Sequence, residues 1–320
     1  MESYELPVHP DHRQARRSAS RCAFATVVMS LIAYALMFAY SYLRTRIGID
    51  FLSDADLALI ANMVCTDLIA MPLAWLLLMH RMPKDAATPA RTPLTLRNWL
   101  FYLPCAFVLM YAGAVTGRLI GALLGDGLAD IVGEAIMPVH PLVTLVCTAV
   151  VGPVAEELFF RKAMIDRLSG FHPVTAILFS ALLFALMHGN LTQFLYALPV
   201  GVLFGIIYYR TQNIGYTVLL HMAVNTIGGL VAQLVSQERE DVMYNGVKLF
   251  NWQDIIMLLY VPLVLGLLVT GVIFLIRYRR RFLPIPSDHP RYAKAFFVNT
   301  GWIIACAAFL GLFLFSEIAG

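Results

Sequence analysis

Charged residues are scarce in this chain. Asp, Glu, Lys and Arg together make up 13% of the 320 residues, whereas hydrophobic residues make up 60%. A typical soluble domain carries about 25% charged residues, so the shortage excludes an ordinary soluble domain. The net charge of +3 is too small to indicate nucleic acid as a partner. The composition instead indicates an integral membrane protein in contact with membrane lipid.

Cysteine pairs are also missing. The five cysteines include no CxxC pair, and each lies in or at the edge of an apolar run. This spacing argues against a disulfide framework and a thiolate metal cluster, and it favours cysteines that pack as small hydrophobic side chains. They are Cys22, Cys65, Cys105, Cys147 and Cys306.

Long apolar runs, by contrast, fill the chain. A membrane-spanning helix needs about 20 apolar residues, and nine runs approach or exceed that length. They predict an all-α fold, a polytopic transmembrane helix bundle with about nine spans. The runs are 22–42, 57–80, 98–124, 140–165, 173–189, 191–209, 213–236, 254–276 and 294–316.

Clusters of basic residues between the runs orient the spans. Basic loops favour the cytoplasmic side of a membrane, and with nine spans all four clusters fall on one side. We therefore expect the N-terminus inside and the C-terminus outside. The clusters lie within 13–21, 81–97, 161–167 and 277–281.

Ionisable side chains within the apolar runs concentrate between residues 140 and 236, and the other runs have almost none in their interiors. Such groups are expensive inside a membrane and are usually functional. We therefore divide the chain into N-terminal transmembrane helices at 1–125, a central helix core at 140–236 and C-terminal transmembrane helices at 237–320.

Glu156 and Glu157 are adjacent, and adjacent residues on a helix point about 100° apart. Glu157 has Arg161 four residues later, in the order that favours an ion pair. Glu156 has no cation nearby on its own helix. We therefore expect its partner to come from another helix, with His188 or His221 as the candidates.

The residue types on these helices permit water activation. A Glu hydrogen-bonded to a His can hold and deprotonate a water molecule. His221 and Asn225 are four residues apart and share a helix face, so both can donate to a developing oxyanion. Together they permit a hydrolytic site without a protein nucleophile. The same residues are also compatible with a buried polar knot that holds helices together, or with a proton path.

Three short motifs carry a family resemblance. They are "EELFFR" with Glu156, Glu157 and Arg161, "FALMH" with Phe184 and His188, and "HMAVN" with His221 and Asn225. In this order and spacing they resemble the CAAX-protease and bacteriocin-processing family of intramembrane proteases, also called the CPBP or Abi family. The resemblance covers about 145–230.

The resemblance implies an intramembrane endopeptidase whose catalytic helix core is the segment 140–236. Glu156 and His188 would then activate the water, and His221 and Asn225 would stabilise the oxyanion. Glu157, Arg161 and Phe184 would support the site. The resemblance also implies an active site near the cytoplasmic face of the plasma membrane, which is the inner membrane in a bacterium.

The sequence is compatible with a mechanism that uses a metal ion and with one that does not. The family is often labelled a metalloprotease, and two His with a Glu can hold zinc. However, no HExxH motif is present, and Glu156 cannot be both a tight metal ligand and a free base. A metal-free mechanism fits as well, and we slightly favour it. The serine motif GxSG and the aspartate motif GxGD of other intramembrane proteases are also missing.

Two further functions remain as alternatives to the endopeptidase. The first is a non-catalytic membrane scaffold or immunity protein that keeps the polar residues as structure. The second is a proton-coupled transporter that uses the acids as a relay. For the endopeptidase, we expect substrates among lipidated proteins, through CAAX-type processing, or among bacteriocins and their leader peptides.

Overall fold

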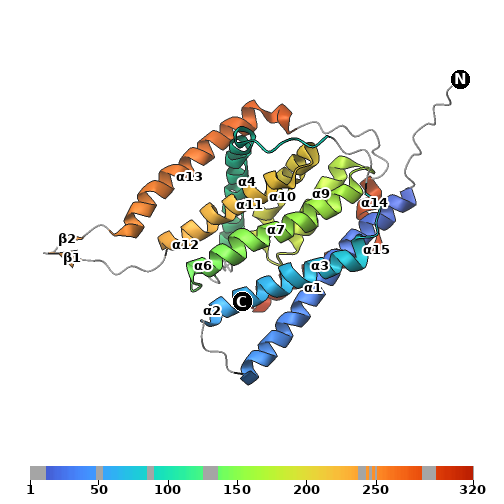
Figure 1. The fold of residues 1–320 in the computed structure, drawn as a ribbon, viewed down its shortest axis with the longest axis horizontal. Coiled ribbons are helices and arrows are strands. Elements are labelled where there is room, and N and C mark those ends of the chain that lie inside the picture. Colours follow the sequence, from blue (N-terminus) through green and yellow to red (C-terminus); the bar gives the residue numbers. More distant parts are fainter. Residues whose placement is uncertain are drawn as a thin grey trace.

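The computed structural model describes residues 12–47, 53–84, 90–124, 136–236, 243–244, 247–248, 251–282 and 293–319. Helices dominate these residues (Figure 1). The strands β1 (Met243–Tyr244) and β2 (Val247–Lys248) are two residues each and pair antiparallel. The predicted all-α polytopic bundle is confirmed.

Four long helices each run without interruption: α1 (His12–Ile47), α4 (Leu96–Leu124), α10 (Leu191–Thr211) and α13 (Trp252–Arg277). The shorter helices α9 (Pro173–Leu186), α14 (Ala293–Phe297) and α15 (Thr300–Ala319) complete the bundle, and η6 (Arg279–Arg281) is a 3-10 turn after α13.

Three other long helices alternate between α-helical and π-helical segments. The first contains α2 (Asp54–Met63), η1 (Val64–Ala70), α3 (Met71–Ala74) and η2 (Trp75–Met79). The second contains α6 (Pro141–Thr144), η3 (Leu145–Val151), α7 (Gly152–Glu156), η4 (Glu157–Ile165) and α8 (Asp166–Leu168). The third contains α11 (Ile214–Asn225), η5 (Thr226–Leu230) and α12 (Val231–Ser236). Segments η1 to η5 are the π-helical ones, a form that is rare and often found at functional sites.

Among the described residues, seven helices are long and apolar enough to cross a membrane, judged by length and composition, and two apolar helices, Pro173–Leu186 and Thr300–Leu314, are shorter. Every predicted run falls on helix. The ninth run, however, is not one helix. The buried Asn299 ends α14 by donating to the carbonyls of Ala295 and Phe296, and it starts α15 by accepting from the Trp302 N–H. The nine spans and the inward N-terminus stay predictions.

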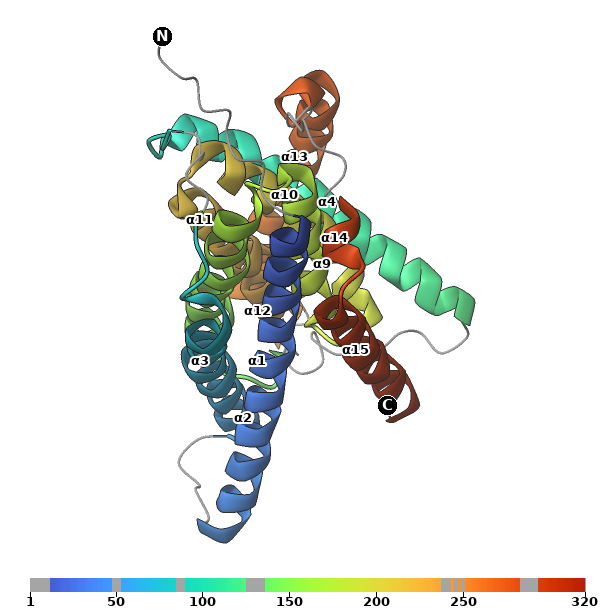
Figure 2. The same ribbon diagram turned by 90° about the vertical axis from the view of Figure 1, so that its right-hand side faces the viewer.

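Helix α9 lies at the centre of the bundle. It packs against α10, η4, α14 and α15, while α1 packs along α15 on one side and α4 packs along α10 and α13 on the other (Figures 1 and 2). A tight turn joins α9 and α10: Gly189 has a φ of 70°, and the Asn190 side chain caps α10. This turn places His188 at the end of α9.

Candidate active site

Glu156 and Glu157 lie at the junction of α7 and η4, in the middle of the helix Pro141–Leu168. Glu157 is fully buried, whereas the side chain of Glu156 keeps 16% of its surface exposed. The two carboxylates therefore differ in access to water, although they are adjacent in the chain. Only Glu156 is open to a small molecule.

Arg161 lies one turn after Glu157 and is also fully buried. Its Nη1 atom is 3.3 Å from Oε1 of Glu157, and its guanidinium lies over the ring of Phe184, with Cζ 4.1 Å from the ring centre. The ring of Phe204 is next, at 5.7 Å. An aromatic face attracts a cation, so Phe184 and Phe204 help to hold the guanidinium away from water.

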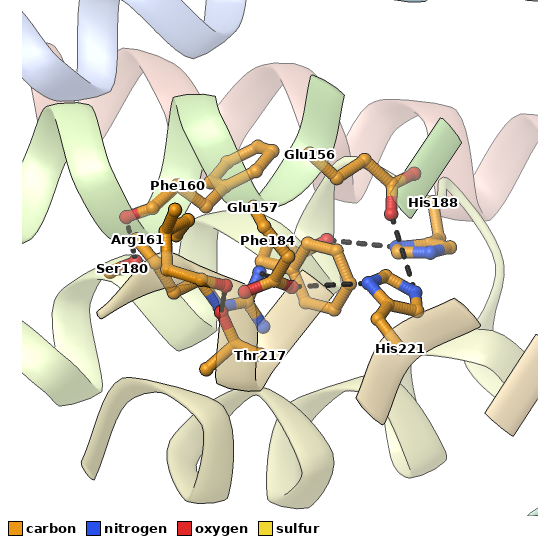
Figure 3. Close-up of polar contacts among 10 residues, drawn as sticks. Glu156, Glu157, Phe160, Arg161, Ser180, Phe184, His188, Thr217 and His221 are labelled. Atoms are coloured by element: carbon orange, nitrogen blue, oxygen red, sulfur yellow. Dashed lines mark hydrogen bonds and ion pairs between the residues drawn. The ribbon is translucent and has the colours of Figure 1, made fainter. Parts of the chain in front are cut away.

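His221 on α11 joins the two glutamates. Its Nδ1 atom is 3.1 Å from Oε1 of Glu157, and its Nε2 atom is 3.6 Å from Oε2 of Glu156 (Figure 3). Of the two histidines that the sequence offers as partners of Glu156, the structure brings His221 into ion-pair range. Glu157 therefore has two roles: it pairs with Arg161, and it orients the imidazole of His221 towards Glu156.

His188 lies beside Glu156 and His221 but has a different hydrogen bond. Its Nδ1 atom is 2.8 Å from the carbonyl oxygen of Phe184. The Phe184 ring packs edge-on against both histidines, with centroid distances of 5.0 Å to His188 and 5.9 Å to His221. When Nδ1 donates to that carbonyl, Nε2 of a neutral His188 is left as an acceptor.

Asn225 is one turn after His221 and points to a different helix. Its Nδ2 atom donates to the carbonyl of Thr148 at 2.8 Å. That carbonyl is free because of the local sequence: the N–H of Gly152 bonds to Cys147 in the π-helical register, and residue 153 is a proline, which has no N–H. Asn225 thus satisfies a carbonyl that the helix leaves unpaired. One amide hydrogen remains for another acceptor.

Asp67 on η1 is a residue that the sequence reasoning missed. Its Oδ2 atom lies 3.7 Å from the position that a Cβ at Gly152 would take, and Gly152 is one turn before Glu156. The helix Asp54–Met79 therefore has a carboxylate in its interior, an exception to the concentration of such groups in 140–236. An acid in the apolar run 57–80 was the available signal.

Within the described residues, no group of three His, Cys, Asp or Glu side chains is arranged to hold a metal ion. Nδ1 of His221 faces Glu157 and Nδ1 of His188 faces a backbone carbonyl, a setting that histidine ligands of metals also have. The described side chains are nevertheless not grouped as a three-ligand zinc site requires.

The comparisons with known proteins agree with the motif resemblance. Residues 138–227 match the model of the family "Type II CAAX prenyl endopeptidase Rce1-like", and this segment includes all seven motif residues. The chain is also similar to the protein named "Putative membrane peptidase YdiL" of Bacillus subtilis (strain 168), with 26% identity over 157 residues. That match covers 47% of this chain and 63% of the relative, which is less than two thirds of its length. No solved structure matches. The predicted family resemblance is confirmed.

Proposed function

We propose that this chain, with its Rce1-like core, is an intramembrane endopeptidase that activates water with Glu156. The observation that carries the proposal is the bridge made by His221 between Glu156 and Glu157, inside an apolar helix bundle. A purely structural knot would bury both acids equally. Here Glu157 is fully buried and ion-paired, whereas Glu156 keeps part of its side chain exposed.

The water would lie between Glu156 and His188. Glu156 takes a proton from the water, and Nε2 of His188 accepts the second water hydrogen and orients the oxygen. The oxygen then forms a bond to the carbonyl carbon of the peptide. When the C–N bond breaks, the protonated Glu156 transfers its proton to the leaving amine. Atoms and charges balance without a protein nucleophile.

His221 and Asn225 would stabilise the oxyanion formed by the attack. With a proton on each ring nitrogen, His221 would donate from Nδ1 to Glu157, and its Nε2–H, which faces Glu156, would be free for the oxyanion once Glu156 has taken the water proton. Asn225 has one amide hydrogen beyond its bond to Thr148. Fixed donors of this kind contribute most when water is excluded, which the surrounding helices favour.

The expected substrates are membrane-associated peptides or the membrane-proximal ends of lipidated proteins. The Rce1-like match favours CAAX-type processing, and processing of bacteriocins or their leader peptides is the second possibility. The family resemblance, together with the orientation expected from the basic clusters, favours a site near the cytoplasmic face of the plasma membrane. Seven apolar helices support an integral membrane protein.

The test is peptide release from membrane substrates by the purified full-length chain in detergent, read by mass spectrometry. Glu156→Gln keeps the size of the side chain but removes the base, so we expect cleavage to fall by at least ~10²-fold, the lower range for losing a general base. Asp54→Asn is the control, because Asp54 is 90% exposed near the end of another helix. Full activity of Glu156→Gln would refute the mechanism.

Two further outcomes distinguish the alternatives. A scaffold or immunity protein predicts no cleavage by the wild type and an intact cellular phenotype for Glu156→Gln. A proton-coupled transporter predicts flux that depends on a pH gradient and no cleaved peptide. A chelator added to the wild-type assay tests the metal question separately, and we expect activity to persist because the described donors do not form a three-ligand group.

A further inference from the structure

Asp67 lies far inside the helix Asp54–Met79. It is 13 residues from one end and 12 from the other, so at about 1.5 Å per residue the carboxylate is roughly 18–20 Å from either end. A carboxylate at such a depth is expensive and usually marks a path or site for a ligand. Among the described residues, no hydrogen bond or ion pair compensates this carboxylate.

The Asp67 side chain is directed at the helix that carries Glu156. Its Oδ2 atom stands 3.7 Å from the place of a Cβ at Gly152, and η1 packs against α7. Since Gly152 and Glu156 are four residues apart, they share one helix face. Asp67 therefore borders the same space as Glu156, about one helical turn away.

The charges around this space do not balance. Arg161 pairs with Glu157, and His221 faces both glutamates. Among the described residues, Asp67 therefore has no counter-charge, and in surroundings of low dielectric its carboxylate would interact strongly with a cation. A positive group from outside the chain would neutralise it. A side chain at position 152 would lie against the Asp67 carboxylate, so Gly152 keeps this side of the carboxylate uncovered.

The π-helical segments gather at the same place. Asp67 lies in η1, Thr148 in η3, Glu157 and Arg161 in η4, and η5 begins directly after Asn225. π-Helical segments occur frequently at functional sites. The helix that carries Asp67 contains such a segment, as do two of the helices that carry motif residues. Asp67 thus shares a π-helical setting with Glu157 and Arg161.

We propose that Asp67 is a specificity-determining residue that binds a Lys or Arg side chain of the substrate beside the scissile bond. The assignment rests on the proposed function. One helical turn is about 5–6 Å and an extended peptide advances about 3.3 Å per residue, so the basic residue would lie one or two positions from the cleaved bond. The substrate class is then a membrane-bound peptide with a cationic residue at that point.

The experiment compares matched peptides that carry Lys or Gln at each of the two positions on either side of a cleaved bond. The full-length chain is assayed in detergent as wild type, Asp67→Asn and Asp67→Glu, with Asp54→Asn as the control for loss of one carboxylate. We expect the wild type to prefer Lys over Gln at one position by about 10-fold or more in kcat/KM, the range for one close charge pair. Asp67→Asn removes the preference, Asp67→Glu restores most of it, and Asp54→Asn leaves it unchanged.

A binding assay separates this inference from the proposed catalysis. Fluorescent Lys and Gln peptides are titrated onto the Glu156→Gln chain with residue 67 as Asp or as Asn. Binding that favours Lys only when Asp67 is present supports the inference, even if the wild type cleaves nothing and the proposed function fails. Equal preference for Lys with Asn at position 67, in cleavage or in binding, overturns it. If the bound cation were the free amino terminus of the peptide, acetylation of that terminus would abolish binding and the Lys-to-Gln change would have no effect. That outcome would also overturn the inference.

Discussion

At the scale of single residues, the site depends on how one imidazole is held. His221 has a carboxylate at each ring nitrogen, and Glu157 in turn has Arg161 on the same helix. The chain Arg161–Glu157–His221–Glu156 therefore runs from a sealed ion pair to a partly open base. The buried pair of Arg161 and Glu157 fixes the orientation of His221, and the partly exposed Glu156 is available as the base.

This arrangement predicts different effects on folding and on activity. Glu157→Gln leaves Arg161 buried without its counter-charge, which costs about 3–5 kcal/mol. Arg161→Met has a smaller cost, because Glu157 keeps its contact with His221. In the double variant Glu157→Gln/Arg161→Met both charges are gone, so we expect most of the stability to return. Activity should stay low, because His221 has lost the Glu157 carboxylate that orients it. Thermal unfolding in detergent and peptide release measure the two effects.

The double variant is the decisive one. Stability losses that simply add in the double variant would show that the pair is not coupled. Recovery of activity together with stability would show that Glu157 serves only to neutralise Arg161.

At the scale of helices, proline and asparagine act together across two elements. Pro153 cannot provide an N–H to Thr148 in the π-helical register, and Asn225 provides one from α11 instead. The bond joins the helices Pro141–Leu168 and Ile214–Ser236 next to Glu156. Asn225 thus positions α11, and with it His221, in addition to its proposed role as an oxyanion donor.

A double-mutant cycle tests this link. Asn225→Ala leaves the Thr148 carbonyl without its partner, which costs about 1–3 kcal/mol. Pro153→Ala introduces an N–H that can reach this carbonyl within the helix. We therefore expect Asn225→Ala to destabilise the chain less in the Pro153→Ala background than in the wild type. Peptide release should remain low in both backgrounds, because the oxyanion donor is gone.

The measurement is the thermal unfolding of both single variants and the double variant, which gives the coupling between Asn225→Ala and Pro153→Ala. Equal losses from Asn225→Ala in both backgrounds would contradict the proposed link between Pro153 and Asn225. Asn225→Ala with wild-type peptide release would contradict the oxyanion role.

At the scale of the whole molecule, the first and last helices close the bundle. The N–H of Gly301 on α15 donates to the Oγ atom of Ser20 on α1 at 3.0 Å. A Cβ at Gly301 would lie 2.2 Å from the Ser20 carbonyl oxygen, so the two backbones touch. Helix α1 also packs against η1, which carries Asp67. The flanking helices therefore support the position of Asp67 beside the core.

The contact at Gly301 predicts a stability effect far from the site. Gly301→Ala must push α15 away from α1, and overpacking of this kind costs about 1–3 kcal/mol. Gly311→Ala is the matched control on the same helix, because nothing lies within 4 Å of its added Cβ and alanine favours helix. We expect the temperature of thermal unfolding in detergent to fall for Gly301→Ala and not for Gly311→Ala. Equal unfolding temperatures for the two variants would contradict the close packing of α1 and α15.

The sequence by itself determined the membrane class, the helical fold and the positions of the apolar helices, because composition and runs of apolar residues are local properties of the chain. It also determined that Glu156 and Glu157 point apart and that Glu157 can reach Arg161, because a helix repeats every 3.6 residues. The break at Asn299 escaped it, since apolar residues surround that position on both sides. Here a buried side chain decided where the helix ends.

The tertiary structure alone decided which distant groups meet. His221 and Glu157 are 64 positions apart and Asn225 and Thr148 are 77 apart, while Asp67 meets the helix of Glu156 at Gly152 from a separate part of the chain. No helical period relates such positions, because their contact depends on how whole helices pack. Local spacing could therefore propose His188 or His221 for Glu156, but only packing places His221 between both glutamates and Asp67 at the edge of the same space.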